Sequence, residues 1–488
     1  MNLLPAQFLQ KQKILLILGS VLLAFLFAAA AVFQWYWMFL VPVVILVFLA
    51  CILHTEKALL FFGALAPLSI NFDNLGGGMG MSLPTEPVYI LLFLLLLFHV
   101  FKNGSIDKAI FKHPLVLVVF AYVIWLWVTS AFSSMPIVSI KFALARTWYI
   151  TLFFFFAVKI FKDYNRIHWF LRAFTIFTLV LVIYTLAMHS ADGFSRSASY
   201  GISWPFFPDH GMYAAAIAFA FFILVFYTFY IRQFNVHVFF SPVFIFLLLV
   251  LLFGIIVSFT RATWLSLIVS SGLWALLRMK IRFSWILIVL FTVSTIAVVK
   301  QDDILYSLES NKQGSSDELE GHVKSVSNIT TDPSNLERIN RWNCAGRMVS
   351  ERPVFGFGPG TYVFKYGPFQ KSSELTLIST NSGDLGDAHS EFFSAMSEMG
   401  YTGLAIFVTL VLTTISYGFT IIYNTTELKV KLTAYMALLS LMTYYTHAVL
   451  NNYSQYDKLA VPLWAFTAII AALDLYHQNG INHVKKTL

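Results

Sequence analysis

The chain has 488 residues, of which 58% are hydrophobic and 11% are charged, and its mean hydropathy is +0.75. A soluble protein of this size needs far more charged surface, so the composition excludes a soluble globular protein and indicates an integral membrane protein with many spans. The net charge of +8 is modest, so the placement of the basic residues is more informative than their sum.

The hydropathy predicts an all-α polytopic membrane protein with about 12–14 transmembrane helices, because a membrane-crossing helix needs about 20 apolar residues. The third span contains Pro67 and is short, so we expect it to be broken or re-entrant. We divide the chain into an N-terminal transmembrane bundle (1–299), a largely hydrophilic loop (300–391) and C-terminal transmembrane helices (392–488). The candidate spans lie near 14–33, 36–54, 58–71, 86–101, 114–132, 139–158, 167–187, 212–231, 238–258, 262–278, 283–299, 403–423, 430–449 and 460–476.

Most basic residues lie in every second connection between these spans, and therefore on one side of the membrane. By the positive-inside rule, the side that carries most of them is cytoplasmic, and both termini lie there. Arg261 and the loop at 300–391 then lie outside. The basic residues assigned to the cytoplasmic side are Lys11, Lys13, Lys57, Lys102, Lys108, Lys112, Lys159, Lys162, Arg166, Arg232, Arg278, Lys280, Arg282, Lys429, Lys431, Lys485 and Lys486.

An apolar run of about forty residues, from Val238 to Leu277, has Arg261 as its principal interruption. The run is long enough to cross twice, which places Arg261 at a tight turn between two spans. A guanidinium in hydrocarbon costs several kcal/mol, so this side chain either anchors the turn at the interface or meets an anionic ligand.

The external loop begins with an acidic, polar stretch at 302–331, which we interpret as a flexible segment leading to the helix that follows. Ser334 and Glu337, after Pro333, form a capping-box pattern that predicts a helix. Pro353 should end it. Arg338 and Arg341 share one flank of this helix, and Glu337 stands four residues before Arg341, so those two are expected to pair. Arg338 then has no such partner and is the more available cation, although by itself it is best explained as part of a solvated helix face.

A glycine-rich run, Gly356-Phe357-Gly358-Pro359-Gly360, follows the helix. It lacks the Gly-Lys-Ser/Thr of a nucleotide loop, so it is either a connection with special backbone angles or a close backbone approach to a ligand. His389 comes next and is expected in the first turn of another helix. There the helix dipole lowers its pKa and favours the neutral imidazole that can accept a proton. An ordinary helix-end histidine is the alternative.

Four further basic residues and histidines are weaker candidates for a ligand site. Lys141 and Arg146 lie in the outer half of the sixth span, and Arg196 and His210 lie in the next-longest external loop. Each has a structural explanation alone, but together they gather on the side where the topology should remove cations. Such a cluster suits a phosphorylated lipid head group at the outer face.

These features resemble the O-antigen ligase and polymerase superfamily of bacterial envelopes. The matching positions are the Thr260-Arg261-Ala262 turn, Arg338 followed by Trp342, the glycine run after Pro353, and His389. The segment from Ser203 to Ala214 is also similar. The likeness covers roughly 190–420 by motif. The chain departs from the family in having Ser390 where asparagine commonly follows the histidine, and in a higher span count.

The resemblance implies a membrane glycosyltransferase of the bacterial inner membrane whose large loop lies in the periplasm. It would take a glycan from an undecaprenyl-pyrophosphate carrier and pass it to an acceptor hydroxyl, inverting the anomeric centre. Arg261 and Arg338 would stabilise the diphosphate and His389 would be the base. Arg341, Lys141, Arg146, Arg196 and His210 are candidate substrate-binding residues. No strong metal-binding pattern is present, so a metal-independent route without cofactor is expected.

Several functions remain open at this point. A ligase would use lipid A–core as acceptor, a polymerase would join lipid-linked repeat units, and a protein O-oligosaccharyltransferase would use side-chain hydroxyls. We favour the ligase from the positions of the arginines and histidine. A lipid or polysaccharide transporter is the rival outside this class, but it predicts inverted repeats that we do not find. Nucleic acid is not an expected partner.

Overall fold

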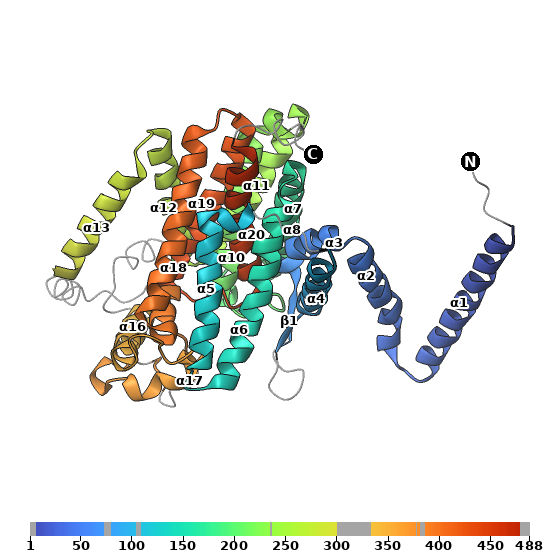
Figure 1. The fold of residues 1–488 in the computed structure, drawn as a ribbon, viewed down its shortest axis with the longest axis horizontal. Coiled ribbons are helices and arrows are strands. Elements are labelled where there is room, and N and C mark those ends of the chain that lie inside the picture. Colours follow the sequence, from blue (N-terminus) through green and yellow to red (C-terminus); the bar gives the residue numbers. More distant parts are fainter. Residues whose placement is uncertain are drawn as a thin grey trace. The chain divides into compact units, whose positions relative to one another are not determined.

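The computed structural model describes residues 6–72, 80–103, 109–234, 237–299, 333–376, 378–380 and 386–478. They are almost entirely helical, and the strands among them are two short ones (Figure 1). The acidic segment at 302–331, which we expect to be flexible, falls outside the described residues. The protein is thus an all-α polytopic membrane protein, as the hydropathy predicted.

The chain forms two compact units, Met1–Leu59 and Leu60–Leu488. The first contains α1 (Ala6–Val32), α2 (Val41–Leu53) and the start of α3 (Thr55–Leu65). Within it, the rings of Phe27 and Phe39 stack with centroids 5.1 Å apart. The three sequence segments proposed above, divided at 299/300 and 391/392, remain predictions.

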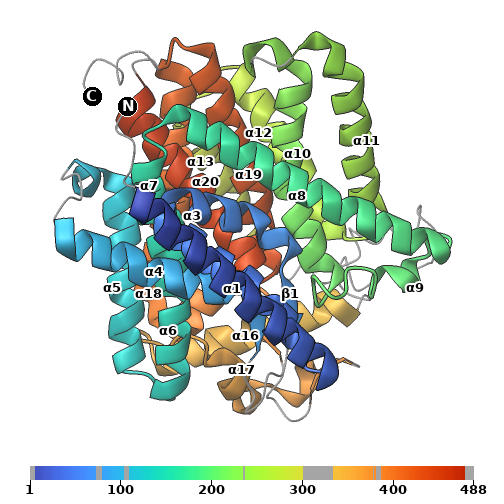
Figure 2. The ribbon, with the colours of Figure 1, turned by 90° about the vertical axis from the view of Figure 1, so that its right-hand side faces the viewer.

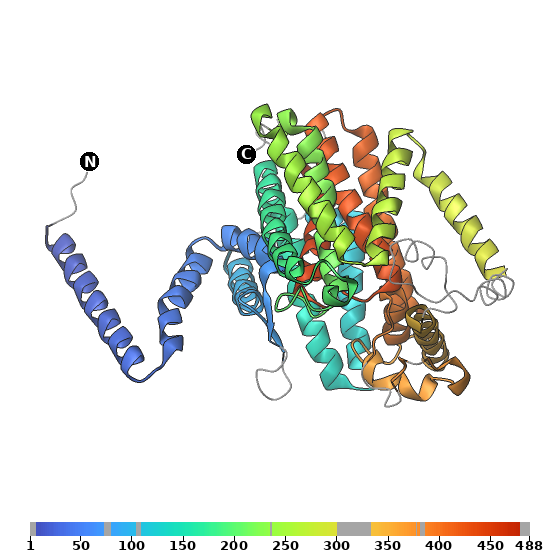
Figure 3. The same cartoon turned by 180° about the vertical axis from the view of Figure 1, so that it is seen from behind.

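The second unit holds the helical bundle, which Figures 2 and 3 show from the side and from behind. Seven helices among the described residues are long and apolar enough to cross a membrane, and α11, α12, α13 and α19 occupy four further expected spans. Its helices are α4 (Thr85–Asn103), α5 (Pro114–Ala131), α6 (Pro136–Ile150), α7 (Ala157–Ile160), α8 (Tyr164–Ala191), α9 (Arg196–Ser199), α10 (His210–Phe229), α11 (Ser241–Val257), α12 (Arg261–Arg278), α13 (Phe283–Val299), α16 (Pro333–Glu351), α17 (Tyr362–Lys365), α18 (Glu391–Asn424), α19 (Leu428–Leu450) and α20 (Asp457–Ala472). A π-helical segment, Thr151–Phe156, joins α6 to α7, and another, Leu473–His477, extends α20.

The expected third span, 58–71, is not one helix. α3 ends at Leu65, a short 3-10 turn contains Pro67, and strand β1 (Ile70–Phe72) follows. β1 pairs antiparallel with β2 (Met81–Leu83), with Ile70 opposite Leu83. The proline limits helix propagation at this point, so the expectation of a broken span is confirmed.

Side-chain contacts define two ends of the bundle. Tyr164 at the start of α8 meets Thr433 near the start of α19, with their hydroxyl oxygens 2.8 Å apart. Tyr423 at the end of α18 donates to the carbonyl of Ile281, in the connection between α12 and α13. The start of α19, the end of α18 and the connection between α12 and α13 are thereby placed at one end of the bundle, together with the start of α8. The end where these contacts lie, called the basic end below, also carries Lys159, Lys162, Arg166, Arg278, Lys280, Arg282, Lys429 and Lys431.

The centre of the bundle is made by α10, α19 and α20, whose side chains are nearly all buried. The ring of Phe219 on α10 stacks on Tyr444 of α19 and Phe466 of α20, at centroid distances of 5.7 and 5.5 Å. The Ser440 hydroxyl donates to the Phe219 carbonyl over 2.7 Å. Because lipid tails are as apolar as these side chains, close packing and such hydrogen bonds hold the helices together.

A kink at Gly400 divides α18, where the backbone adopts φ +72°. Tyr401 N donates to Pro353 O over 2.9 Å, and Gly358 N donates to Glu398 O over 2.8 Å. The glycine-rich run is therefore docked on the kink by main-chain hydrogen bonds. A Cβ at Gly400 would lie 2.1 Å from Val354 O, so glycine is required both for space and for the left-handed backbone. Of the two roles expected for this run, the contacts support the structural connection.

Replacing Gly400 by alanine should therefore destabilise the protein by about 2 kcal/mol or more, from the strained φ and the clash. The midpoint of thermal unfolding in detergent should fall by several degrees. Gly272→Ala is the matched control, because Gly272 is exposed on α12 and a methyl group added there would have nothing within 4 Å. Equal unfolding midpoints for the two variants would contradict the role assigned to the kink.

Candidate active site at the end of the bundle opposite the basic end

The turn around Arg261 lies between α11 and α12, as predicted. α11 ends at Val257, and Phe259 takes a positive φ of 51° to reverse the chain. The Thr260 hydroxyl donates to His210 O over 3.4 Å. Thr263 Oγ1 lies 3.1 Å from His447 Nε2 on α19. Arg261, the first residue of α12, is thereby fixed between the start of α10 and the last turn of α19.

Helix α16 occupies the range predicted for it and carries Arg338 at the same end of the bundle. Arg338 Nε donates to Leu450 O over 3.2 Å, and its Nη1 donates to Asn335 Oδ1 over 3.3 Å. The side chain is half-buried. Its guanidinium is therefore tied to the final residue of α19 while part of it is open to solvent.

Arg341 is more deeply buried than Arg338 and pairs with Glu337, as the spacing predicted. Its Nε donates to Glu337 Oε1 over 2.6 Å, and the guanidinium lies over the Tyr366 ring, 3.9 Å from its centroid. Glu337 also accepts hydrogen bonds from Thr376 and Ser379. Burial raises the pKa of Glu337, but these hydrogen bonds outweigh it, so the carboxyl stays ionised with a pKa below its ordinary value. Arg341 and Glu337 form a buried ion pair.

His389 precedes α18 and does not lie in its first turn, so that expectation is wrong by two residues. The helix starts at Glu391, with Ser390 as its N-cap. His389 adopts φ +46°. Its backbone N–H donates to Asp387 Oδ1 over 2.9 Å, and its Nδ1 lies 3.2 Å from the same oxygen.

The pKa of His389 is lowered, in the expected direction but for different reasons. Burial lowers it most, the carboxylate of Asp387 opposes this, and the positive charges of Arg338 and Arg341 lower it further. The side chain remains 38% exposed, so a substrate can reach it. A neutral imidazole is therefore present near pH 7.

The last turn of α19 contacts all three segments that carry the candidate catalytic residues. Ser390, next to His389, donates through Oγ to Ala448 O over 3.2 Å, while Arg338 donates to Leu450 O. His447, in the same turn, contacts Thr263, two residues after Arg261. Residues far apart in the sequence thus surround one helix end.

The other substrate-binding candidates come from α6, α9 and α10. The ring of His210 contacts Tyr200, which follows α9 and its first residue Arg196, with centroids 4.5 Å apart. Since His210 O accepts from Thr260, His210 lies beside the Arg261 turn. Lys141 is exposed on α6.

Arg146 lies in a separate buried cluster. Its Nη1 donates to Tyr122 Oη over 3.2 Å, and its Nη2 lies 3.7 Å from Glu391 Oε2. Glu391 also accepts from Tyr444 Oη over 2.8 Å and from Ser454 N over 2.7 Å. The cavity beside them has a volume of about 10 Å³, room for one water molecule. These contacts are with protein groups, and substrate binding by Arg146 remains a prediction.

The sequence reasoning missed three residues that face this site: His447, Tyr453 and Asp387. Tyr453 follows α19, and its hydroxyl would lie 2.7 Å from a Cβ at Gly211 on α10. Burial raises the pKa of Tyr453 well above its ordinary value, and the nearby charges that act on it include Asp209, Arg338 and Asp387. The phenol is thus protonated among the charged groups. Only the Asp387 spacing, two residues before His389, gave a signal in the sequence.

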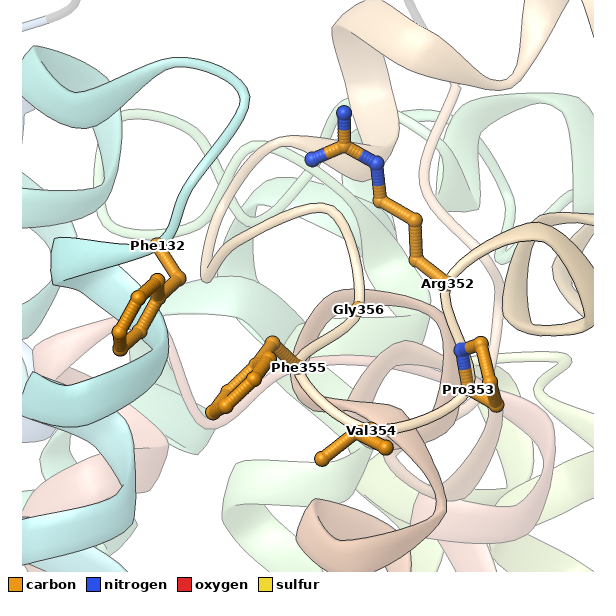
Figure 4. A pocket seen from close by; sticks show the side chains of 6 residues that line it. All are labelled: Phe132, Arg352, Pro353, Val354, Phe355 and Gly356. Carbon is orange, nitrogen blue, oxygen red and sulfur yellow. The ribbon is translucent and has the colours of Figure 1, made fainter.

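An apolar hollow of about 310 Å³ lies at the same end of the bundle, where α5 meets the connection after α16 (Figure 4). The rings of Phe132 and Phe355 stack along it, with centroids 4.6 Å apart. The guanidinium of Arg352 points away from these rings in Figure 4. Exposed aromatic side chains near a helix end are typical of the membrane–water interface.

Residues 245–408 match the family model described as O-antigen ligase. This segment is about one third of the chain and includes Arg261, Arg338, the glycine-rich run and His389. No curated protein sequence matches the chain. The family comprises O-antigen ligases and polymerases, which indicates glycosyl transfer by a multi-pass membrane enzyme. Over this segment, the chain is similar to the O-antigen ligase and polymerase superfamily.

Proposed function

We propose that this protein transfers a glycan from undecaprenyl pyrophosphate to a hydroxyl of lipid A–core at the periplasmic face of the bacterial inner membrane. The observation that carries the proposal is the meeting of Arg338, the Arg261 turn and the His389 segment at the last turn of α19. The reaction needs stabilisation of a diphosphate and removal of a proton, and these residue types supply both.

The leaving group determines the role of the arginines. As the bond between the anomeric carbon and the phosphate oxygen breaks, negative charge develops on the lipid diphosphate. A guanidinium stabilises such charge through paired hydrogen bonds and needs no metal ion. Arg338 is half-buried at the site, and Arg261 begins α12, which contacts the last turn of α19 through Thr263. We assign these two residues to the diphosphate, with Arg196, His210 and Lys141 as further substrate contacts.

The nucleophile determines the role of His389. The acceptor hydroxyl attacks the anomeric carbon, the bond to the diphosphate breaks, and the hydroxyl proton passes to the imidazole. A single displacement inverts the anomeric configuration. The lowered pKa of His389 keeps the imidazole neutral before the reaction, as a general base must be. Such a base is typically worth about 10²–10⁴-fold in rate.

The charge distribution supports the proposed sidedness. Basic residues gather at the end of the bundle opposite the site. The positive-inside rule assigns that end to the cytoplasm, which leaves the site on the periplasmic side. A lipid-linked glycan presented at the outer leaflet would then reach it directly.

Purified protein in proteoliposomes should join a defined undecaprenyl-pyrophosphoryl glycan to lipid A–core and release undecaprenyl pyrophosphate. The rate should be unchanged by a chelator, because no step is assigned to a divalent metal. Product analysis with a panel of acceptors identifies the acceptor. Transfer only to a second lipid-linked repeat unit would instead make the protein a polymerase, and transfer only to a peptide hydroxyl would make it a protein O-oligosaccharyltransferase.

Arg338→Ala should lower the transfer rate by about 10²–10³-fold, as loss of a transition-state donor does. Its unfolding temperature should fall less than that of Arg341→Ala, because Arg338→Ala removes a hydrogen bond to Leu450 O but leaves no buried charge unpaired. Arg341→Ala should instead lower the unfolding temperature, because it leaves the Glu337 carboxylate buried without its cation. Arg352→Ala, at an exposed position, is the control for loss of a positive charge. The assignment fails if Arg338→Ala unfolds as early as Arg341→Ala while folded Arg338→Ala retains its rate.

His389→Ala should abolish transfer while the protein still folds. In the unaltered protein, kcat/KM should fall as the pH decreases through the pKa of His389, because protonation removes the acceptor lone pair. Since that pKa is lowered from the ordinary value of 6.5, the acid limb should lie below pH 6.5. A limb above that pH, or a His389→Ala variant with normal turnover, would remove His389 from the mechanism.

A further inference from the structure

Asp387 contacts His389 twice, through its backbone and through its ring. One carboxylate oxygen, Oδ1, accepts from the backbone N–H of His389 at 2.9 Å and lies 3.2 Å from Nδ1 of the imidazole. The first contact closes a turn in which an aspartate side chain binds the amide two residues ahead, which suits the left-handed φ of +46° at His389. The second places a carboxylate beside the ring nitrogen.

Neighbouring elements leave this geometry little freedom. Ala388, between the two residues, is fully buried in an apolar cluster with Cys344, Ala345 and Met348 of α16. Ser390 is held by the carbonyl of Ala448 on α19. Both flanks of His389 are thus fixed, while its side chain stays 38% exposed and that of Asp387 stays 28% exposed.

We propose that Asp387 is the positioning residue of the glycosyl transfer: its carboxylate holds the proton of His389 on Nδ1, so that Nε2 faces the acceptor hydroxyl as the base. This inference rests on the proposed function and adds to it a role for Asp387, which that function does not use. A carboxylate on one imidazole nitrogen selects the tautomer and stabilises the imidazolium that forms when the other nitrogen takes a proton. Contacts of this kind are often long without substrate and shorten in the reacting complex.

The charges around the imidazole explain why such a residue is needed. From α16, Arg338 and Arg341 disfavour the imidazolium and Glu337 favours it, while the charge of Asp387 also acts on Tyr453 in the connection after α19. The arginines that would hold the diphosphate therefore also oppose proton uptake by the base. Asp387 supplies a negative charge in contact with the ring, which offsets this repulsion as the proton arrives.

The decisive variant is Asp387→Asn, whose amide oxygen can still accept from the His389 backbone while the charge is lost. We expect kcat to fall about tenfold to a thousandfold, with KM for the lipid-linked donor nearly unchanged because the arginines are intact. Removing the negative charge lowers the pKa of His389 further, so the acid limb of the kcat profile should move to lower pH. Asp192→Asn, an exposed aspartate after α8, is the matched control.

Nitrogen NMR of histidine-labelled protein tests the proposal without turnover. The His389 signal is assigned by its loss in His389→Gln. We expect the Nδ1–H tautomer in the unaltered protein and a different tautomer balance in Asp387→Asn, with both proteins folded by their thermal unfolding. An unchanged tautomer together with an unmoved acid limb would overturn the proposal.

The two hypotheses fail in different ways. If His389→Ala is inactive but Asp387→Asn behaves as the unaltered protein, the positioning role is wrong and the proposed function stands. If His389→Ala is fully active, the base itself is wrong. Asp387→Ala, which also removes the turn at His389, should be less active than Asp387→Asn, and equal activities would count against the double contact.

Discussion

The carbonyl groups at the end of α19 are the constraint on which the arrangement of the site depends. The last carbonyls of a helix have no amide partner one turn ahead, and near a membrane they must be satisfied by other groups. Here Ser390 donates to Ala448 O, and Arg338 donates to Leu450 O. The need to satisfy one helix end thus places the segment that carries His389 and the helix that carries Arg338 side by side.

Buried charge divides several cations away from the basic end into two groups. Arg146, Arg341 and Lys458 are almost fully buried and lie within ion-pair distance of Glu391, Glu337 and Asp457, respectively. Charges in such places need partners because desolvation costs several kcal/mol per ion. Arg338 and His389 keep part of their surface accessible. The first group maintains the scaffold, and the second is available for chemistry.

The buried pairs also fix distant parts of the chain to the site. Glu391, two residues after His389, binds Tyr444 of α19, Ser454 in the connection after it and Arg146 of α6. Asp457, at the start of α20, accepts from Ser69 and Thr85 beside the β-hairpin, and Lys458 donates to Asn71 in β1. These contacts therefore connect α4, α6, α18, α19, α20 and β1.

The sequence by itself determined the features that depend on local residue spacing or on the apolar character that a span through the hydrocarbon core requires. Hydropathy located most spans, the capping pattern and Pro353 located α16, and four-residue spacing paired Glu337 with Arg341. The likeness to the family pointed to Arg261, Arg338 and His389, but not to how they meet. Only the tertiary structure decided that the α19 terminus joins them, that His447 and Tyr453 lie nearby, and that Arg146 binds Glu391, 245 positions away. Such contacts join segments remote in the chain, and helix-packing geometry, which periodicity does not encode, selects among the possible partners.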